Sequence, residues 1–170
     1  AQHRIDHPRP DRRRTLMAPI SYVSTRGAAP ELGFADVLLA GLAVDGGLYV
    51  PSRWPSLTVG SLERFADMTY AEIAVEVMWP FVEGSIDAAD FAAIVTDAYA
   101  TFDAADVVPL IDLGEDLWLA ELFHGPTLAF KDIALQLVGR LFDHELSRRG
   151  ERITVVGATS GDTGSAAIDA

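Results

Sequence analysis

A single lysine, Lys131, is the residue of this chain best suited to covalent chemistry. The sequence has 13 lysine and arginine residues, and all of them except Lys131 are arginines. The lysine lies in the segment His124-Gly-Pro-Thr-Leu-Ala-Phe-Lys-Asp132. A lysine amine can form a Schiff base with a carbonyl compound, whereas a guanidinium stays protonated. The segment therefore indicates an enzyme whose lysine acts as nucleophile and proton shuttle. The alternative is a solvated loop lysine in an arginine-rich composition.

A second segment, Thr159-Ser-Gly-Asp-Thr-Gly164, has the composition of an anion-binding loop. The apolar run Ile153–Ala158 before it predicts a buried parallel strand, and a helix is expected from Thr163 to Ala170. Free backbone N–H groups and the positive end of the helix dipole would then point into the loop and favour a carboxylate or phosphate. The alternative is an ordinary strand-to-helix turn with Asp162 as the N-cap, and the spacing alone favours neither.

Three further candidates have a plainer interpretation. His124 is a lone histidine for which a hydrogen bond within the loop is favoured over catalysis, and no partner stands at metal-ligand spacing, so no metal is expected. Ser160 lacks a histidine and an aspartate in a recognisable order, which argues against a serine-hydrolase triad. Arg26 could pair with a ligand phosphate, although a structural arginine that bonds loop carbonyls is favoured.

Composition excludes several classes of protein. The net charge of −12 argues against nucleic acid as the main partner, because phosphate backbones are bound by basic surfaces. The absence of cysteine excludes disulfides and thiolate metal sites, and it fits a reducing compartment such as the cytoplasm. No apolar run approaches the roughly 18 residues that a membrane-spanning helix needs, so no membrane partner is expected. The 49% of hydrophobic residues can fill a globular core.

The two ends of the sequence differ from the rest. Residues 1–16 are rich in arginine and lack apolar periodicity, so we interpret them as a leader or a misplaced start, with Met17 as the natural beginning. At the other end, a helix that starts near Thr163 would stop at Ala170 without a capping residue. We therefore expect the chain to be an N-terminal fragment of a longer protein.

Between these ends, the apolar spacing predicts an all-helical unit. After an extended segment at 22–26, helices are expected over residues 30–43, 61–67, 69–79 and 87–102. Thr69 and Glu72 form a capping-box pattern, and Pro80 is expected to disturb the end of the third helix. The pattern changes near residues 103–106, where we place a domain boundary.

The unit after this boundary has an α/β pattern. It begins with two strand candidates, 107–113 and 117–122, which a Gly-Glu-Asp turn joins as a hairpin. A strong helix is expected over Asp132–Arg149, with an acidic residue in its first turn and Gly150 as the stop. A helix, a buried strand and a further helix in this order are typical of α/β architecture.

Four segments together resemble a known enzyme family. Residues 122–132 closely resemble the pyridoxal-phosphate lysine segment of threonine synthases, and residues 159–164 are similar to the glycine loop that follows it in that family. Tyr22-Val-Ser-Thr-Arg-Gly27 and Asp45-Gly-Gly-Leu-Tyr-Val-Pro51 look like its N-terminal signature. The four segments occur in the family's order and span nearly all of the chain after Met17.

The resemblance implies a mixed α/β fold in two parts. Residues 17–103 would form the helical N-terminal domain of a threonine synthase. Residues 104–170 would start a fold-type II pyridoxal-phosphate domain, similar to that of the tryptophan synthase β subunit. The family's later loop for the cofactor phosphate and its residue facing the pyridine nitrogen are absent from the sequence. We therefore expect the domain to be truncated, and the chain alone neither to turn over substrate nor to hold the cofactor tightly.

The resemblance also implies roles for individual residues. Lys131 would be the catalytic lysine, which holds pyridoxal 5'-phosphate covalently beside Phe130 and Asp132 and acts as the general base. The substrate would be O-phospho-L-homoserine, which is converted with water to L-threonine and phosphate. The substrate carboxylate would bind the loop made of Thr159, Ser160, Gly161, Asp162, Thr163 and Gly164. An aspartate at position 162 favours the threonine synthase branch over cysteine synthases and serine dehydratases.

Two alternatives stay open beside this interpretation. A threonine synthase-like phospholyase would share all four segments and release phosphate without making threonine. A truncated, non-catalytic module would keep the fold of this region as a partner-binding fragment. A plain α/β domain with accidental matches is remote, because four ordered segments would have to coincide.

Overall fold

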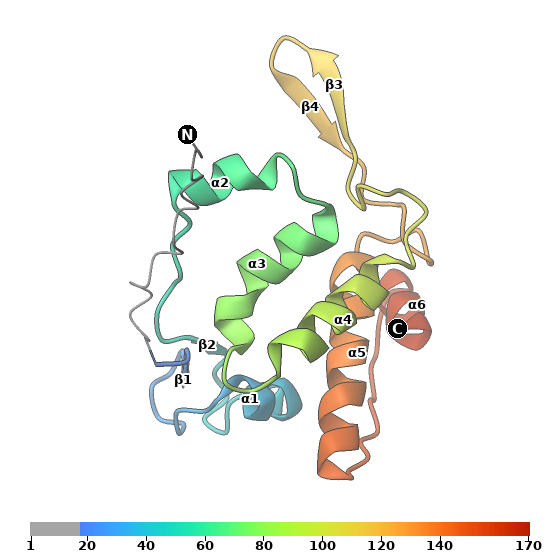
Figure 1. Ribbon diagram of the computed structural model, residues 1–170. Helices are drawn as coiled ribbons and strands as arrows, with labels where there is room; N and C mark the ends of the chain where they lie inside the picture. The colour runs from blue at the N-terminus through green and yellow to red at the C-terminus, as the bar shows by residue number, and fades with distance from the viewer. Residues whose placement is uncertain (1–17) are drawn as a thin grey trace, which may run out of the picture.

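The computed structural model describes residues 18–170, so the leader expected at residues 1–16 and the start at Met17 lie outside the described residues. Figure 1 shows helices gathered in one body and a two-stranded arm that leaves it. In chain order the elements are β1 (Tyr22–Ser24), α1 (Phe34–Ala40), β2 (Tyr49–Pro51), α2 (Val59–Phe65), α3 (Tyr70–Val82), α4 (Ala88–Tyr99), β3 (Leu110–Gly114), β4 (Leu117–Ala120), α5 (Asp132–Arg149) and α6 (Asp162–Asp169).

The third helix shows both a confirmed start and a corrected end. The predicted capping box forms, since Glu72 N–H donates to Thr69 Oγ1 at 3.3 Å and Thr69 N–H donates to a Glu72 carboxylate oxygen at 2.8 Å. The expected end near Trp79 is wrong, because α3 continues through Pro80 to Val82. Val82 is buried in the core, and this packing outweighs the hydrogen bond that Pro80 cannot donate.

The first helix is shorter than predicted, since α1 spans Phe34–Ala40 rather than residues 30–43. Backbone hydrogen bonds of 2.8 and 3.1 Å between Tyr22 and Leu32 hold the preceding segment extended. Gly41 ends the helix with a φ of 65°, a conformation that glycine adopts readily. β1 and β2 pair antiparallel nearby, which confirms the extended segment predicted at 22–26. The prediction that residues 30–102 are all-helical is wrong, because β2 lies among them.

One hydrophobic core joins the two parts of the chain. α3 packs on α4, and α4 packs on α5 (Figure 1). Phe91 of α4 and the α5 residues Leu137 and Leu141 are buried in the same cluster. The boundary predicted near residues 103–106 therefore does not separate two cores within the described part, and the division into two domains stays a prediction.

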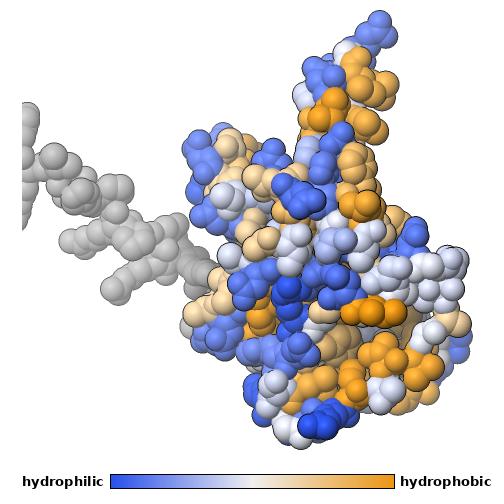
Figure 2. Space-filling view, turned by 90° about the vertical axis from the view of Figure 1, so that its right-hand side faces the viewer, coloured by the Kyte–Doolittle hydropathy of each residue, from blue (hydrophilic) through white to orange (hydrophobic). Residues whose placement is uncertain are grey.

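The predicted hairpin is confirmed. β3 and β4 pair antiparallel across a turn at Glu115 and Asp116, whose φ values are 53° and 61°. The hairpin projects from the helices, and every residue of both strands is exposed (Figure 1). Figure 2 shows apolar side chains along this arm, and those between 56% and 62% exposed are Leu110, Leu113, Leu117 and Trp118. The arm therefore adds nothing to the core that α3, α4 and α5 share.

The prediction of a strand at Ile153–Ala158 is wrong. Residues 151–159 have no regular secondary structure, and Val155 and Val156 are 75% and 90% exposed. A strand needs a neighbouring strand for its backbone hydrogen bonds, and no other segment of residues 18–170 pairs with this one. The described chain is therefore a mixed α and β protein in which the expected parallel sheet is not formed.

The predicted bounds of the lysine helix are confirmed, because α5 runs over Asp132–Arg149. Gly150 ends it in the left-handed conformation, with a φ of 66°. Although α5 has 18 residues, neither it nor any other helix in the described range is long and apolar enough to cross a membrane.

Candidate active site

Asp132 holds the loop that presents Lys131. Asp132 is 0% exposed, and its two carboxylate oxygens accept hydrogen bonds from the Thr127 N–H at 2.8 Å and from the Thr127 hydroxyl at 2.7 Å. Side-chain to backbone bonds of this kind fix the chain ahead of a helix. The Asp132 carboxylate is thus engaged within the loop, and its direct contact with a cofactor stays a prediction.

The turn before Asp132 requires a glycine at position 125. A Cβ atom on Gly125 would lie 2.5 Å from the Asp132 Cβ, which is closer than two carbon atoms can pack. The Leu128 N–H donates to the Gly125 carbonyl at 3.0 Å, and Leu128 adopts a positive φ of 62°. This tight turn lets Thr127 reach the Asp132 carboxylate.

His124 has the hydrogen-bonding role that was favoured for it. Its Nε2 lies 2.8 Å from a Glu121 carboxylate oxygen, and its carbonyl accepts a hydrogen bond from the Asp103 N–H at 2.9 Å. The imidazole also stacks on the Phe123 ring at 4.7 Å between centroids. These contacts tie the lysine loop to the segment that follows α4. Among residues 18–170, no group of three or more His, Asp or Glu residues could hold a metal ion.

Lys131 itself stands at the N-terminus of α5. It occupies the N-cap position with helical backbone angles, and its side chain makes no capping hydrogen bond. Its Nζ lies 4.3 Å from the centroid of the Phe130 ring, a cation–π contact. Lys131 is half-buried and Phe130 is 56% exposed. The arrangement therefore leaves the amine open to a ligand and places an aromatic face next to it.

Thr159 organises the second loop. Its Oγ1 accepts hydrogen bonds from the Gly161 N–H at 3.2 Å and from the Gly164 N–H at 3.1 Å. Because both lone pairs are engaged, the hydroxyl proton of Thr159 is left for donation to another group. The interpretation of Asp162 as the N-cap is wrong, since Gly161 is the N-cap with a φ of 137° and Asp162 is the first residue of α6. Thr159 supplies the side-chain oxygen that Asp162 was expected to supply.

The start of α6 is open to solvent. Residues 159–162 are exposed, and no described group accepts a hydrogen bond from the N–H of Asp162 or Thr163. Free N–H groups at the positive end of a helix bind carboxylates and phosphates. The carboxylate of Asp162 lies in the same first turn and competes with such an anion. The geometry therefore allows an anion site whose affinity depends on the charge of Asp162.

Close packing of α6 on α5 connects the two loops. Gln136 of α5 is 1% exposed, its Nε2 donates to an Asp169 carboxylate oxygen at 2.7 Å, and its Oε1 accepts from Arg140 at 2.9 Å. A Cβ on Gly139 would lie 2.7 Å from the Ala170 carbonyl oxygen, so glycine is needed where the helices approach (Figure 1). Gln136 and Gly139 were not predicted from the sequence; their spacing of three on one helix face was the available signal.

The predicted site residues thus form two groups. Phe130, Lys131 and Asp132 meet at the start of α5, and the Thr159–Gly164 loop opens at the start of α6. No hydrogen bond joins Lys131 to that loop within residues 18–170. An amine and an anion-binding loop on two packed helices can serve a substrate that carries both an electrophile and a carboxylate or phosphate.

Arg26 has the structural role that the sequence favoured. Its Nη1 donates to the Asp45 carbonyl at 3.0 Å. The Asp45 carboxylate accepts from the Ser24 hydroxyl at 2.7 Å and from the N–H groups of Ala28 and Gly47, both at 2.9 Å. These hydrogen bonds, that of Ser24 first, hold the pKa of Asp45 below its usual value. The two N-terminal segments therefore form one turn network.

Known proteins match this chain in sequence and in structure. Residues 21–99 match the family described as threonine synthase N terminus. The threonine synthase of Pseudomonas aeruginosa is 58% identical over 148 residues, which cover 87% of this chain and 32% of that protein. The crystal structure of PLP-bound threonine synthase from Brucella melitensis has a TM-score of 0.86 at 54% identity and covers 88% of this chain and 32% of its own. Threonine synthase-like 2 of Xenopus laevis is 38% identical over 151 residues, which cover 88% of this chain and 32% of that protein.

The chain spans about a third of the length of the curated relatives that it matches, with 32% coverage in each case named here. Over that third, the solved structure from Brucella melitensis is similar to this chain in both sequence and fold, with 54% identity and a TM-score of 0.86. The chain therefore belongs to the threonine synthase family, and its residues 21–99 are the N-terminal region of that family.

Proposed function

We propose that this chain supplies the lysine-bearing part of a pyridoxal-phosphate-dependent threonine synthase. The observation that carries the proposal is Lys131, the single lysine of the sequence, which Asp132 holds at the start of α5 with its amine open to a ligand. Relatives named threonine synthase, one of them solved with PLP bound, support the same assignment. The start of a fold-type II domain at residues 104–170 is part of this proposal.

The described residues fit the reactive end of the cofactor. Lys131 offers a primary amine to the aldehyde, and the exposed Phe130 ring offers an apolar surface beside it. When bound, pyridoxal phosphate supplies an electron sink for breaking the bond between the substrate α-carbon and its proton. The Asp132 carboxylate keeps its place against Thr127, so its part in this proposal is to orient Lys131.

Two groups of this chain act on the substrate in the proposed reaction. The Lys131 amine accepts the proton from the substrate α-carbon and returns a proton further along the carbon chain. The loop of residues 159–164 binds the substrate carboxylate through the free N–H groups of Asp162 and Thr163 and the remaining hydroxyl proton of Thr159. The packing of α6 on α5 holds the Lys131 amine and the loop of residues 159–164 in fixed positions relative to each other.

The proposed substrate is O-phospho-L-homoserine. Phosphate leaves its γ-carbon and water adds at its β-carbon, so that L-threonine and phosphate result. A threonine synthase-like phospholyase would release the phosphate without forming threonine. The higher identity to a threonine synthase, 58% against 38% for threonine synthase-like 2, favours the synthase. A non-catalytic module is the remaining alternative. We still predict a small-molecule substrate, no nucleic-acid or membrane partner, and a cytoplasmic location.

Reductive trapping tests the proposed lysine. The chain is incubated with pyridoxal phosphate, reduced with borohydride and mapped by peptide mass spectrometry, both folded and in urea. Because Lys131 is the single lysine, the chain's α-amine is the internal reference for labelling. We expect the ratio of Lys131 adduct to α-amine adduct to be higher in the folded chain than in urea. Lys131→Arg is the control and should lose the lysine adduct while the α-amine adduct remains.

An equal ratio in the folded and unfolded chain would mean that Lys131 is a solvated loop lysine, and the proposal would be wrong. In the same samples, incubation with O-phospho-L-homoserine should release no phosphate above the Lys131→Arg background, because these residues are about a third of a relative's length, 32%. Steady turnover by the 170 residues alone would refute the expected inactivity of the isolated chain. Threonine among the products would then separate a synthase from a phospholyase.

A further inference from the structure

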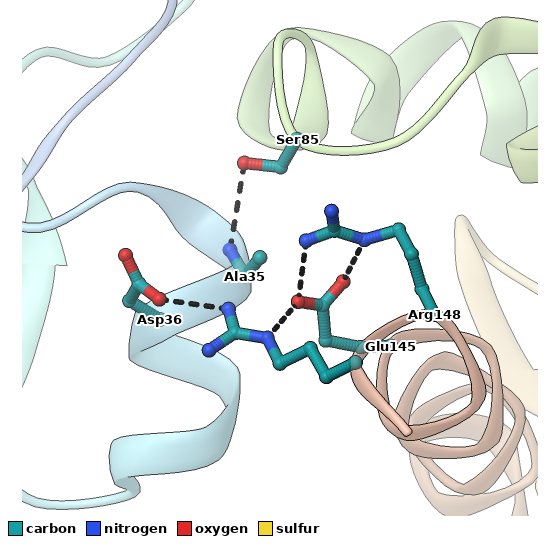
Figure 3. Close-up of polar contacts among 6 residues, drawn as sticks. Ala35, Asp36, Ser85, Glu145 and Arg148 are labelled. Atoms are coloured by element: carbon teal, nitrogen blue, oxygen red, sulfur yellow. Dashed lines mark hydrogen bonds and ion pairs between the residues drawn. The ribbon is translucent and has the colours of Figure 1, made fainter. Parts of the chain in front are cut away.

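A buried carboxylate lies near the end of α5 that is remote from Lys131. Glu145 is 1% exposed and lies between α5 and α1 (Figure 3). Arg148 Nε donates to one Glu145 oxygen at 3.0 Å, and Arg148 Nη2 donates to the other at 2.7 Å. A bidentate guanidinium of this kind satisfies both oxygens of a carboxylate. Arg148 therefore suffices to neutralise Glu145.

Arg149 has a second partner that Arg148 lacks. Its Nε also donates to Glu145, but its Nη2 donates to Asp36 of α1 at 2.7 Å. Figure 3 shows Asp36 and Glu145 on opposite sides of one guanidinium group. At the same place the Ala35 N–H donates to Ser85 Oγ at 3.4 Å, which ties α1 to the turn after α3. Arg149 therefore connects the N-terminal part of the chain to the lysine helix.

The helix α5 connects this ion pair rigidly to Lys131. A helix rises about 1.5 Å per residue, so Arg149 lies about 27 Å along the axis from Lys131. Between them, the buried Leu137 anchors the middle of α5 in the core. Near Lys131, the Tyr99 hydroxyl donates to the Ile133 carbonyl at 3.4 Å, which is a long hydrogen bond. The buried residues of α5 run along its length, from Asp132 to Glu145, so a change at Arg149 shifts the helix as one body and moves Lys131 with it.

We propose that the Asp36–Arg149 ion pair sets the tilt of α5 and thereby the position of the Lys131 amine. Asp36 and Arg149 are then positioning residues, which act on Lys131 through the helix and touch no ligand. The inference rests on the proposed function only for the role of Lys131 in the reaction. Its geometry can be tested without pyridoxal phosphate or substrate, because Lys131 is the single lysine of the chain.

The test is the acetylation rate of Lys131 by N-acetoxysuccinimide, divided by that of the chain's α-amine and measured by peptide mass spectrometry. Asp36→Ala removes one partner of the bridge, and its fold should survive because the Asp36 side chain is 55% exposed. We expect this variant to change the ratio by roughly twofold, the size of effect that the loss of one partly exposed ion pair supports. Asp36→Glu should restore the native ratio, because it keeps the charge.

The matched control is Asp90→Ala, which removes an exposed first-turn carboxylate from α4. Its ratio should equal the native one. Salt should move the native ratio toward the Asp36→Ala value, because a partly exposed ion pair is screened, and should leave the Asp36→Ala ratio unchanged. A native ratio in Asp36→Ala, or an equal change in Asp90→Ala, would overturn the proposal. Since the reagent acylates any free amine, neither outcome depends on cofactor binding, which reductive trapping tests separately.

Discussion

The Asp132→Ala substitution removes the acceptor of two hydrogen bonds at once. The Thr127 N–H and hydroxyl donate to the Asp132 carboxylate at 2.8 and 2.7 Å. A buried donor that loses its partner costs about 1–3 kcal/mol. Asp132 is 0% exposed, whereas Thr127 is half-buried and can regain part of its hydrogen bonding from water. We therefore expect the free energy of unfolding to fall by about 2–3 kcal/mol.

The assay is urea denaturation followed by circular dichroism, in which a shift of the midpoint at constant slope reports stability. Two milder variants divide the effect. Asp132→Asn keeps one acceptor oxygen and should lose about 1 kcal/mol. Thr127→Val removes the hydroxyl, keeps the backbone N–H bond and should also lose about 1 kcal/mol.

A loss of less than about 1 kcal/mol in Asp132→Ala would mean that water satisfies both Thr127 donors at no cost and that Asp132 does not hold the loop. The double variant with Thr127→Val gives a second criterion. Residues in contact should be non-additive by at least about 0.5 kcal/mol. Additive losses would show that the two side chains stabilise the loop independently.

Two further predictions concern the helices that support the site. Thr69→Ala breaks the capping box of α3 and should cost about 1 kcal/mol of unfolding free energy, whereas Thr69→Ser should retain it, as urea midpoints will show. The hydrogen bonds from Arg148, followed by those from Arg149, hold the pKa of Glu145 below its usual value. Glu145 therefore contributes stability above its unfolded pKa that is lost as pH falls through the lower native value. Urea midpoints from neutral pH to about pH 3 should fall less steeply in Glu145→Gln, and equal slopes would contradict this.

Local features of this chain could be predicted because neighbouring residues decide them. The capping box at Thr69 and the bounds of α5 depend on residues within a few positions of each helix end. The hairpin of β3 and β4 follows from a turn between two apolar runs. The structural role favoured for Arg26 is also confirmed, since its guanidinium donates to the Asp45 carbonyl of a turn.

Features that depend on a distant partner were predicted poorly. The apolar run at residues 153–158 has the composition of a buried strand, yet no described strand lies beside it to pair with it. Pro80 was expected to disturb the end of α3, but the burial of Val82 keeps the helix intact to that residue. One local feature was also missed: at the start of α6, Thr159 and not Asp162 supplies the capping oxygen, and Gly161 is the N-cap with a φ of 137°.

The chemistry available to this protein is already visible in its amino-acid sequence: one lysine amine, a loop of hydroxyls and glycines, and a family pattern in four ordered segments. Residue types and short-range spacing carry that information. The folded chain adds the contacts by which Gln136 reaches Asp169 across 33 residues and Arg149 reaches Asp36 across 113 residues. Such contacts arise from the packing of helices that are far apart in the chain, and no local pattern specifies them.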